Sequence, residues 1–527
     1  MKSISLLFLL LGFGAALHAQ QRIYVSQNAT GANSGTSWAD AFTDLQTALV
    51  SAQAGDEIWV AQGTYKPTNG SDRTLSFDPP SGIRLIGGFA GNETALAQRQ
   101  WENHPTALSG DIGVAGDSTD NSYNVLYLFE PDSNTVVDGF FIRHGNADFS
   151  GPAEFRDRRQ CGGGMYIMAG EMDAYALIIN CVFEHNTARS HGGGLIENSF
   201  GEGSAGSLIQ HCRFENNRSL GNGGGLAKYG NSWEERGEEI TYCTFTQNRA
   251  QLKGGGAFYS DGIGNNCFDL SHCTFLENIA GDNGGGVYLA LGKPGGALAV
   301  IKADTFVRNT SLSGHGIFLG EVFFSFVKKC SVDSLYFDSN GTSIFNVFTS
   351  AMAFLENSHF KINNISSVND MGGFHFSSNA FIEVDNISIS NSQCPIPLLI
   401  FNVEKIANIS INQSNTIGPL IDLNPRRKNL LIENLICSDN IIKGNNYISI
   451  DRLGLEERTY QFNNSTIIHR NNQNLSLLFS DISAQTNLAY NNTVLKINRA
   501  MTRGFLENTF DHVLALLHES LSRSVVS

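Results

Sequence analysis

The sequence is poor in charge and in proline, and it has no long apolar run after its first nineteen residues. Only 16% of the 527 residues are charged and 11 are proline, which excludes a coiled coil and a charge-rich disordered chain. No later stretch holds eighteen or more consecutive apolar residues, so we expect no transmembrane segment after signal removal. Positive charge is also in deficit, with 35 Lys and Arg against 50 Asp and Glu and a net charge of −15. This balance disfavours nucleic acid as a partner.

The first nineteen residues have the pattern of a secretory signal peptide. Lys2 supplies the positive start, an apolar run extends from Ile4 to Leu17, and Ala19 is a small residue at the cleavage point. We therefore expect residues 1–19 to be removed and the protein to be exported. The predicted location is secreted or cell surface (outer membrane associated), with the periplasm as the alternative.

A repeated phrase occupies the middle of the chain. It reads Cys-x-Phe-x-x-Asn, then about five residues, then Gly-Gly-Gly and a short apolar run. So regular a repeat is typical of a solenoid. The phenylalanines recur in steps of 30 or 31 residues, at Phe183, Phe214, Phe245, Phe275 and Phe306. The glycine runs keep the same steps and begin at Gly162, Gly192, Gly223, Gly254 and Gly284.

The short apolar runs between Asn and Gly predict strands rather than helices. Stacked strands of this kind form a parallel β-helix in which successive coils lie about 4.8 Å apart. We predict an all-β, right-handed parallel β-helix with N- and C-terminal capping segments. Residues 20–124 would form the N-terminal cap and first coils, residues 125–500 the β-helix, and residues 501–527 a C-terminal capping helix. A further short helix is predicted over Thr43–Gln53.

The repeated cysteines and phenylalanines are predicted to face the interior. The two residues are separated by two positions, and side chains two apart on a strand point to the same side. Neighbours on parallel strands are poorly placed for a relaxed disulfide, so we expect buried reduced thiols. The spacing lacks Cys-x-x-Cys pairs, and no metal site is predicted. The four cysteines are Cys181, Cys212, Cys243 and Cys273.

The repeated asparagines and glycines are predicted to shape the bends. Asparagine tolerates the left-handed backbone and can bond to backbone groups or to the asparagine in the next coil. Each glycine triplet permits positive φ and close backbone approach. No Gly-Lys-Ser/Thr follows the triplets, which excludes a phosphate-binding loop. The asparagines are Asn186, Asn217, Asn248, Asn278 and Asn309.

The opening of the chain resembles that of exported right-handed parallel β-helix repeat proteins of Bacteroidetes type. The resemblance rests on Ile23–Val25, Gly31–Trp38, Asp44–Ala48, Gly55–Val60 and Gly63–Pro67. The Phe-x-x-Asn and Gly-Gly-x-Ile-like phrases are similar to the repeats of polymorphic outer membrane proteins. The wider group with the pectate-lyase-like (pectin lyase) fold holds lyases, glycosidases, tailspikes and adhesins, so the resemblance implies the fold but not one activity.

Insertions that recur at one corner of the predicted coil mark the candidate site. They include Asn198–Gly206 and Tyr229–Glu239, and successive loops in one phase would stack into a wall. In the second loop Trp233 could stack on a sugar ring, while Glu234 and Glu235 could bind hydroxyls or cations. A solvated charged loop is the alternative interpretation.

An upstream insertion, Asp148–Gln160, adds Arg156 and Arg158 to the candidate residues. We predict an adhesin or carbohydrate-binding protein whose partner is an extracellular polysaccharide or a host or cell-surface glycan. The alternative is a polysaccharide lyase or glycoside hydrolase. A lyase would neutralise a uronate with Ca²⁺ or a basic residue and use a base. A glycosidase would need two carboxylates about 5–10 Å apart. The sequence identifies no catalytic residue, and Ca²⁺ is the one cofactor considered, for the lyase alone.

Overall fold

The computed structural model describes residues 20–152, 157–199, 201–230, 238–261, 267–290, 298–312 and 316–320, and beyond these the strands between residues 329 and 498. Several predicted features lie outside the described residues. They are the signal peptide (1–19), the C-terminal capping helix (501–527), and the candidate site residues Arg156, Trp233, Glu234 and Glu235.

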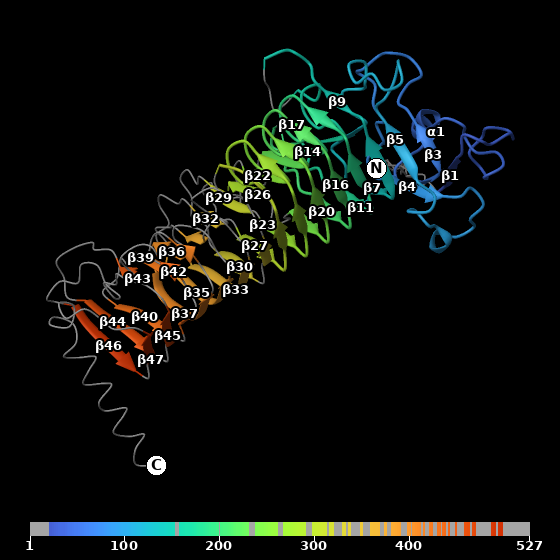
Figure 1. Ribbon diagram of the computed structural model, residues 1–527. Helices are drawn as coiled ribbons and strands as arrows, with labels where there is room; N and C mark the ends of the chain where they lie inside the picture. Colours follow the sequence, from blue (N-terminus) through green and yellow to red (C-terminus); the bar gives the residue numbers. More distant parts are fainter. Residues whose placement is uncertain are drawn as a thin grey trace, which may run out of the picture.

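The described strands wind into one elongated solenoid whose coils follow one another from the N-terminal end to the far end (Figure 1). They form parallel sheets of 28, 12, five and two strands. The predicted all-β parallel β-helix is therefore confirmed.

One α-helix is present among the described residues, α1 (Leu45–Ser51), which lies inside the predicted range Thr43–Gln53. The Asp44 carboxylate accepts a hydrogen bond from the Thr47 N–H and caps its N-terminus.

The 28-stranded sheet consists of two adjoining columns of strands. The first column is β1 (Arg22–Val25), β2 (Glu57–Ala61), β4 (Arg84–Phe89), β7 (Val136–Asp138), β11 (Leu177–Ile179), β15 (Leu208–Gln210), β19 (Glu238–Thr241), β23 (Cys267–Ser271), β27 (Leu298–Lys302) and β30 (Lys329–Asp333). The second column is β3 (Gly63–Tyr65), β5 (Thr106–Ser109), β8 (Phe140–Arg143), β12 (Val182–Glu184), β16 (Arg213–Glu215), β20 (Thr244–Thr246), β24 (Thr274–Leu276), β28 (Thr305–Val307) and β31 (Tyr336–Asp338).

Two further sheets complete the coils. The five-stranded sheet is β9 (Asn146–Ala147), β13 (Thr187–Ala188), β17 (Arg218–Ser219), β21 (Arg249–Ala250) and β25 (Ile279–Ala280). The 12-stranded sheet is β6 (Leu126–Phe129), β10 (Met165–Ala169), β14 (Leu195–Ser199), β18 (Leu226–Gly230), β22 (Ala257–Asp261), β26 (Val287–Ala290), β29 (Ile317–Gly320), β32 (Phe348–Ser350), β34 (Phe374–Phe376), β36 (Leu398–Phe401), β39 (Ile421–Asn424) and β43 (Ile448–Ile450).

Past residue 329 the coils continue with longer strands. The strands β33 (His359–Val368), β35 (Phe381–Ser390) and β37 (Val403–Asn412) each span both columns of the large sheet. After β37 the columns separate again, into β40 (Asn429–Glu433), β44 (Arg458–Asn463) and β46 (Thr486–Asn491) beside β41 (Ile436–Ser438), β45 (Thr466–Arg470) and β47 (Val494–Asn498). The two-stranded sheet consists of β38 (Asn415–Thr416), which follows β37 in the sequence, and β42 (Ile441–Ile442), which follows β41.

Left-handed backbone at three positions bends each regular coil. In one coil these are Asn180 (φ 52°) between β11 and β12, His185 (φ 54°) after β12, and Gly192 (φ 64°) at the glycine triplet. A Cβ on the next glycine, Gly193, would lie 2.4 Å from the Gly224 carbonyl oxygen, so the triplet also serves close backbone approach. The prediction for the glycines is confirmed.

The predicted bonds of the ladder asparagines to backbone groups and to the asparagine of the next coil are confirmed, but these asparagines do not take the left-handed conformation that asparagine tolerates. The left-handed residue is the one before each of them, as at His185 before Asn186. The reason is that the asparagine side chain is needed inside the coil. Asn186 Nδ2 donates to the Ile142 carbonyl (2.9 Å) and to Asn217 Oδ1 (3.1 Å), and the Asn186 N–H donates to the same Oδ1 (3.1 Å). The pattern repeats through Asn248 and Asn278 to Asn309.

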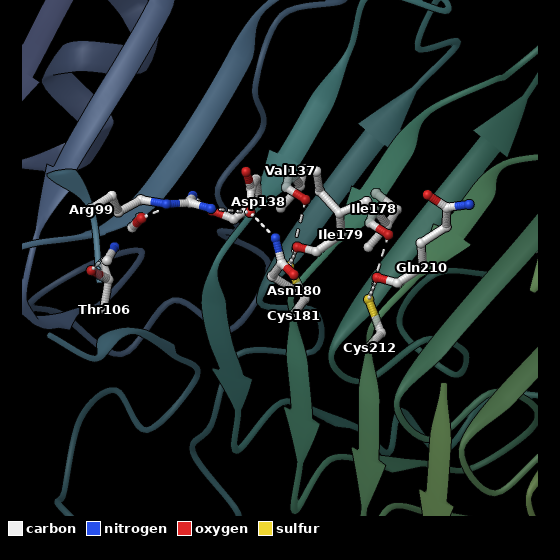
Figure 2. Close-up of polar contacts among 12 residues, drawn as sticks. Arg99, Thr106, Val137, Asp138, Ile178, Ile179, Asn180, Cys181, Gln210 and Cys212 are labelled. Carbon is white, nitrogen blue, oxygen red and sulfur yellow. Dashed lines mark hydrogen bonds and ion pairs between the residues drawn. The ribbon is translucent and has the colours of Figure 1, made fainter. Parts of the chain in front are cut away.

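The phenylalanine and cysteine ladders fill the interior as predicted. The Phe183 and Phe214 rings stack with centroids 4.8 Å apart and planes 5° apart. The Cys181 thiol donates to the Ile179 carbonyl (3.3 Å), and the Cys212 thiol donates to the Gln210 carbonyl (3.3 Å), as Figure 2 shows. All four ladder thiols are buried and unpaired by disulfides. The predicted reduced, buried thiols are therefore confirmed for this ladder.

The cysteine ladder ends on a carboxyl group. Asp304 follows Cys273 by 31 positions and is 1% exposed, and its Oδ1 accepts the Cys273 N–H at 2.7 Å. Burial raises the pKa of Asp304 well above its usual value, because the interior disfavours the charged form. This aspartate takes the place that the repeat gives to cysteine.

A buried ion pair ties the N-terminal segment onto the first regular coils. Arg99 Nη2 lies 2.8 Å from Asp138 Oδ1, and Asn180 Nδ2 donates to the same oxygen at 2.9 Å (Figure 2). The side chains of Arg99 and Asp138 are 10% and 9% exposed. Removing either partner would leave a buried charge, so this contact fixes how the segment after β4 lies on the coil.

Candidate binding groove

Arg158, the one described residue among the predicted site residues, makes contacts within the fold. Its guanidinium lies 4.5 Å from the centre of the Tyr127 ring. Its Nη1 donates to Ser76 Oγ (3.1 Å) and its Nη2 to the Thr74 carbonyl (3.2 Å). The side chain thus joins the segment of residues 74–78 to β6, which is a structural role.

The residues beside Arg158 are also engaged with one another. Arg159 Nη2 lies 2.8 Å from Asp157 Oδ2, and the Arg159 guanidinium lies 3.8 Å from the centre of the Phe149 ring. Burial opposes ionisation of Asp157, but the hydrogen bonds from Arg159 outweigh it and hold the pKa of Asp157 below its usual value. A cavity of about 340 Å³ is lined in part by Asp157, Arg158 and Arg159.

The predicted loop wall and Arg158 belong to different corners of the coil. Arg158 lies between β9 and β10, whereas residues 201–206, the described part of the first predicted insertion, lie between β14 of the 12-stranded sheet and β15 of the large sheet. A ligand bound at the corner of the predicted wall would therefore lie at a different part of the coil from Arg158.

A groove lies along the corner formed by the five-stranded sheet. Two cavities, of about 370 and 470 Å³, both have Arg218 in their lining. We call the two together the corner groove. Its first half is lined by Asp111, Gly116, Ser118, Asn121, His144, Gly145, Asn146, His185, Thr187 and Arg218. Its second half is lined by Arg218, Ser219, Arg249, Ala250, Gln251, Ile279 and Gly281.

Two exposed arginines in neighbouring coils form the basic part of the corner groove. Arg218 and Arg249 are directly in register on β17 and β21. Neither guanidinium forms an ion pair in the described part of the chain, whereas Arg308 pairs with Glu277 at 2.6 Å on the neighbouring column. Like charges in adjacent positions on a sheet repel. The corner groove therefore carries two adjacent positive side chains with no ion pair among the described residues, on a chain of net charge −15.

Two histidines line the first half of the corner groove. His144 and His185 occupy left-handed positions in successive coils, and their ring centroids lie 6.3 Å apart. The His144 Nδ1 lies 3.5 Å from Ser109 Oγ. The pKa of His144 is lowered, mainly because the ring is partly buried and also because Arg143 is close. The lowered pKa favours the neutral imidazole, which can accept a proton at one ring nitrogen and donate a hydrogen bond from the other.

Two oxygen acceptors lie in the same half of the corner groove. The Asp111 carboxylate accepts the Gly116 N–H at 2.9 Å through Oδ1. Asn121 Nδ2 donates to the His144 carbonyl at 2.7 Å, which fixes the amide. Asn121 Oδ1 is buried and has no hydrogen-bond partner among the described residues. The first half of the groove thus offers acceptors where the second half offers donors.

The sequence interpretation did not select the corner groove. Arg218 and Arg249 each follow a ladder asparagine, so the 31-residue step alone would have placed them in one column. His144 and Asp111 precede the regular repeats and carry no such signal. Within the described residues no group of three or more His, Cys, Asp or Glu side chains is placed to hold a metal ion. The described helices include none long and apolar enough to cross a membrane.

Comparisons with known proteins add little to this description. No family model matches the sequence, and no curated protein matches it. Among solved structures, the crystal structure of pectate lyase Pel9A aligns at 10% identity over 90% of this chain and 79% of that chain, with a TM-score of 0.21. Similarity at this level assigns no activity to the chain. The resemblance to Bacteroidetes-type and polymorphic outer membrane proteins stays a prediction. The structure itself defines the class: a parallel β-helix repeat protein with a basic corner groove.

Proposed function

We propose that the protein is an exported carbohydrate-binding scaffold, of the kind that serves as an adhesin, and that the corner groove binds an acidic polysaccharide. The observation that carries the proposal is the register of Arg218 and Arg249, two exposed guanidiniums without an ion pair in the described residues. Arginine binds carboxylate and sulfate groups through two parallel hydrogen bonds. The partner would be an extracellular polysaccharide or a cell-surface glycan, with no cofactor required for binding.

The shape of the groove supports a chain-like ligand. The two cavities adjoin along the solenoid axis and share Arg218, so an extended chain could contact several coils at once. The acidic remainder of the protein would repel a polyanion elsewhere, which confines binding to this corner. Rigid strands carry the arginines, so little ordering is required when the ligand binds.

Calorimetric titration of residues 20–527 with acidic and neutral oligosaccharides tests the proposal. We expect the acidic oligosaccharide to bind and the double variant Arg218→Gln/Arg249→Gln to bind it at least about tenfold more weakly. The matched control is Arg308→Gln, an exposed arginine whose charge Glu277 already neutralises. Equal affinities of the double variant and the wild type would contradict the proposal.

A polysaccharide lyase is the second candidate function. The observation that favours it is the presence of His144, with its lowered pKa, and Arg218 in the lining of one cavity. A neutral imidazole could abstract the proton next to a uronate carboxylate that an arginine neutralises. Release of unsaturated uronate from acidic polysaccharides, measured with and without Ca²⁺, tests this. If the wild type releases unsaturated uronate and His144→Gln does not, the result would support a lyase. If the protein binds a polysaccharide but releases no product from any substrate, only the proposal of a binding scaffold would remain.

A further inference from the structure

We propose that the corner groove selects a hydroxylated acid, a sugar acid whose carboxylate lies at the arginines and whose hydroxyls lie at Asp111 and Asn121. The inference rests on the proposed function and specifies its ligand. The groove has an acceptor end, formed by Asp111 and Asn121, and a donor end, formed by Arg218 and Arg249. A ligand that fills both ends must carry donors and an anion in one unit.

The acceptor end suits hydroxyl groups. Asp111 Oδ1 accepts one backbone N–H, and the carboxylate keeps further lone pairs, with no ion pair among the described residues. Asn121 is 5% exposed, and its amide nitrogen is already used on the His144 carbonyl. Its oxygen is therefore the end of the amide left to accept, and it has no partner among the described residues. A ligand hydroxyl would supply the donor that this buried acceptor lacks.

The donor end suits a carboxylate. A guanidinium carries five N–H donors and no acceptor, so Arg218 and Arg249 can donate to the carboxylate of the ligand but cannot accept hydrogen bonds from its hydroxyls. The two arginines extend from β17 and β21, whereas Asp111 belongs to the segment after β5. Arg218 lines the same cavity as Asp111 and Asn121, so one arginine of the donor end borders the space that the acceptor end borders.

The two ends together discriminate among polyanions. A polyanion without hydroxyls could use the arginines alone, and its charge would be repelled by the Asp111 carboxylate. A sugar acid would use both ends, because its hydroxyls turn the same carboxylate into a partner. Asp111 should therefore weaken the binding of polyanions without hydroxyls and strengthen the binding of sugar acids.

The test is Asp111→Asn titrated with an oligouronate and with an oligoacrylate of equal charge. Asparagine keeps the shape of Asp111 and an acceptor for the Gly116 N–H, so the fold is expected to persist, which thermal unfolding checks. We expect the variant to bind the oligouronate about tenfold more weakly and the oligoacrylate about twofold more tightly. Only recognition of hydroxyls by Asp111 predicts that the two affinities change in opposite directions.

Two other results would overturn the inference, and they are distinguishable. If Asp111→Asn binds both ligands more tightly, Asp111 only repels anions and the hydroxyl assignment is wrong, while the proposed function stands. If the wild-type protein binds neither ligand at low salt, the proposed function fails as well. Arg218→Gln serves as the reference variant, since it should weaken both ligands alike.

Discussion

Glu197 and Lys228 face each other inside the solenoid, with Glu197 Oε2 and Lys228 Nζ 4.0 Å apart and side chains that are 0% and 2% exposed. They lie in register on β14 and β18, and Lys228 Nζ is 5.3 Å from the centre of the Tyr259 ring on β22. Within the part of the chain that the structure describes, neither carboxylate oxygen of Glu197 has a hydrogen-bond partner. A buried charge pair of this kind depends on both of its members.

Replacing one member of this pair is expected to be costly. Lys228→Met should lower the free energy of unfolding by about 3–5 kcal/mol, because it leaves the Glu197 carboxylate buried without its cation. The double variant Glu197→Leu/Lys228→Met should be close to wild type or more stable, since it removes the desolvation cost of both charges. Urea denaturation of the two variants checks this. A double variant less stable than Lys228→Met would contradict it.

Replacing any one asparagine of the ladder is expected to lower the free energy of unfolding. Asn248→Ala removes the acceptor of two donors on Asn217 and the donor to the Phe214 carbonyl. Each buried group left without a partner costs about 1–3 kcal/mol, so the loss of unfolding free energy should exceed that of an ordinary surface change. Thr246→Ala, in the strand before it, is the control. Equal effects of the two substitutions on urea unfolding would argue against a structural ladder.

Asp304 is expected to make stability depend on pH. Its pKa is raised in the folded state, so the folded protein holds a proton that the unfolded chain releases above about pH 3.9. The stabilising contribution is complete below that value and is lost as the pH rises toward the folded pKa. Asp304→Asn should therefore be more stable than wild type at pH 8 and should show a smaller difference at pH 4. Thermal unfolding of both proteins across this range measures the difference, and parallel curves would contradict the prediction.

His144 is expected to link ligand binding to pH. Its lowered pKa keeps the ring neutral at pH 7 in the free protein. A bound anion favours the protonated ring and raises that pKa, so affinity for an acidic oligosaccharide should increase as the pH falls from 7 to 5. His144→Gln should remove part of this increase while leaving affinity at pH 7.5 nearly unchanged. Titrations at several pH values, with Arg308→Gln as control, test the prediction, and an identical pH profile in His144→Gln would refute it.

The repeat spacing was sufficient to predict the coil and much of its interior. The 30- or 31-residue step places Phe183 over Phe214 and Cys181 beside Cys212, and the two-residue period on a strand turns both inward. These relationships are local and recur, so one alignment of the sequence with itself reveals them. The spacing did not reveal that the left-handed residue is the one before each ladder asparagine, because asparagine is suited both to that backbone and to the buried hydrogen bonds that it makes here.

The candidate site was less predictable than the coil. Arg158 was selected for its charge, yet the structure shows it bonded to Ser76 and Thr74, residues more than 80 positions earlier. The loop residues Trp233, Glu234 and Glu235 lie outside the described residues and stay a prediction. The corner groove was missed because Asp111 and His144 precede the regular repeats, where no periodicity indicates which residues become neighbours.

By itself the sequence determined the winding of the chain, the stacking of its ladders and the exposed column that holds Arg218 and Arg249. These follow from a repeated step, since each coil transmits its register to the next by parallel pairing. Only the tertiary structure decided that Asp111 and Asn121 meet that column and that Arg158 is used within the fold. Those contacts depend on how the segments outside the repeat lie on the coil, and that placement is set by particular side-chain hydrogen bonds and ion pairs, such as Arg99 with Asp138, that no spacing encodes.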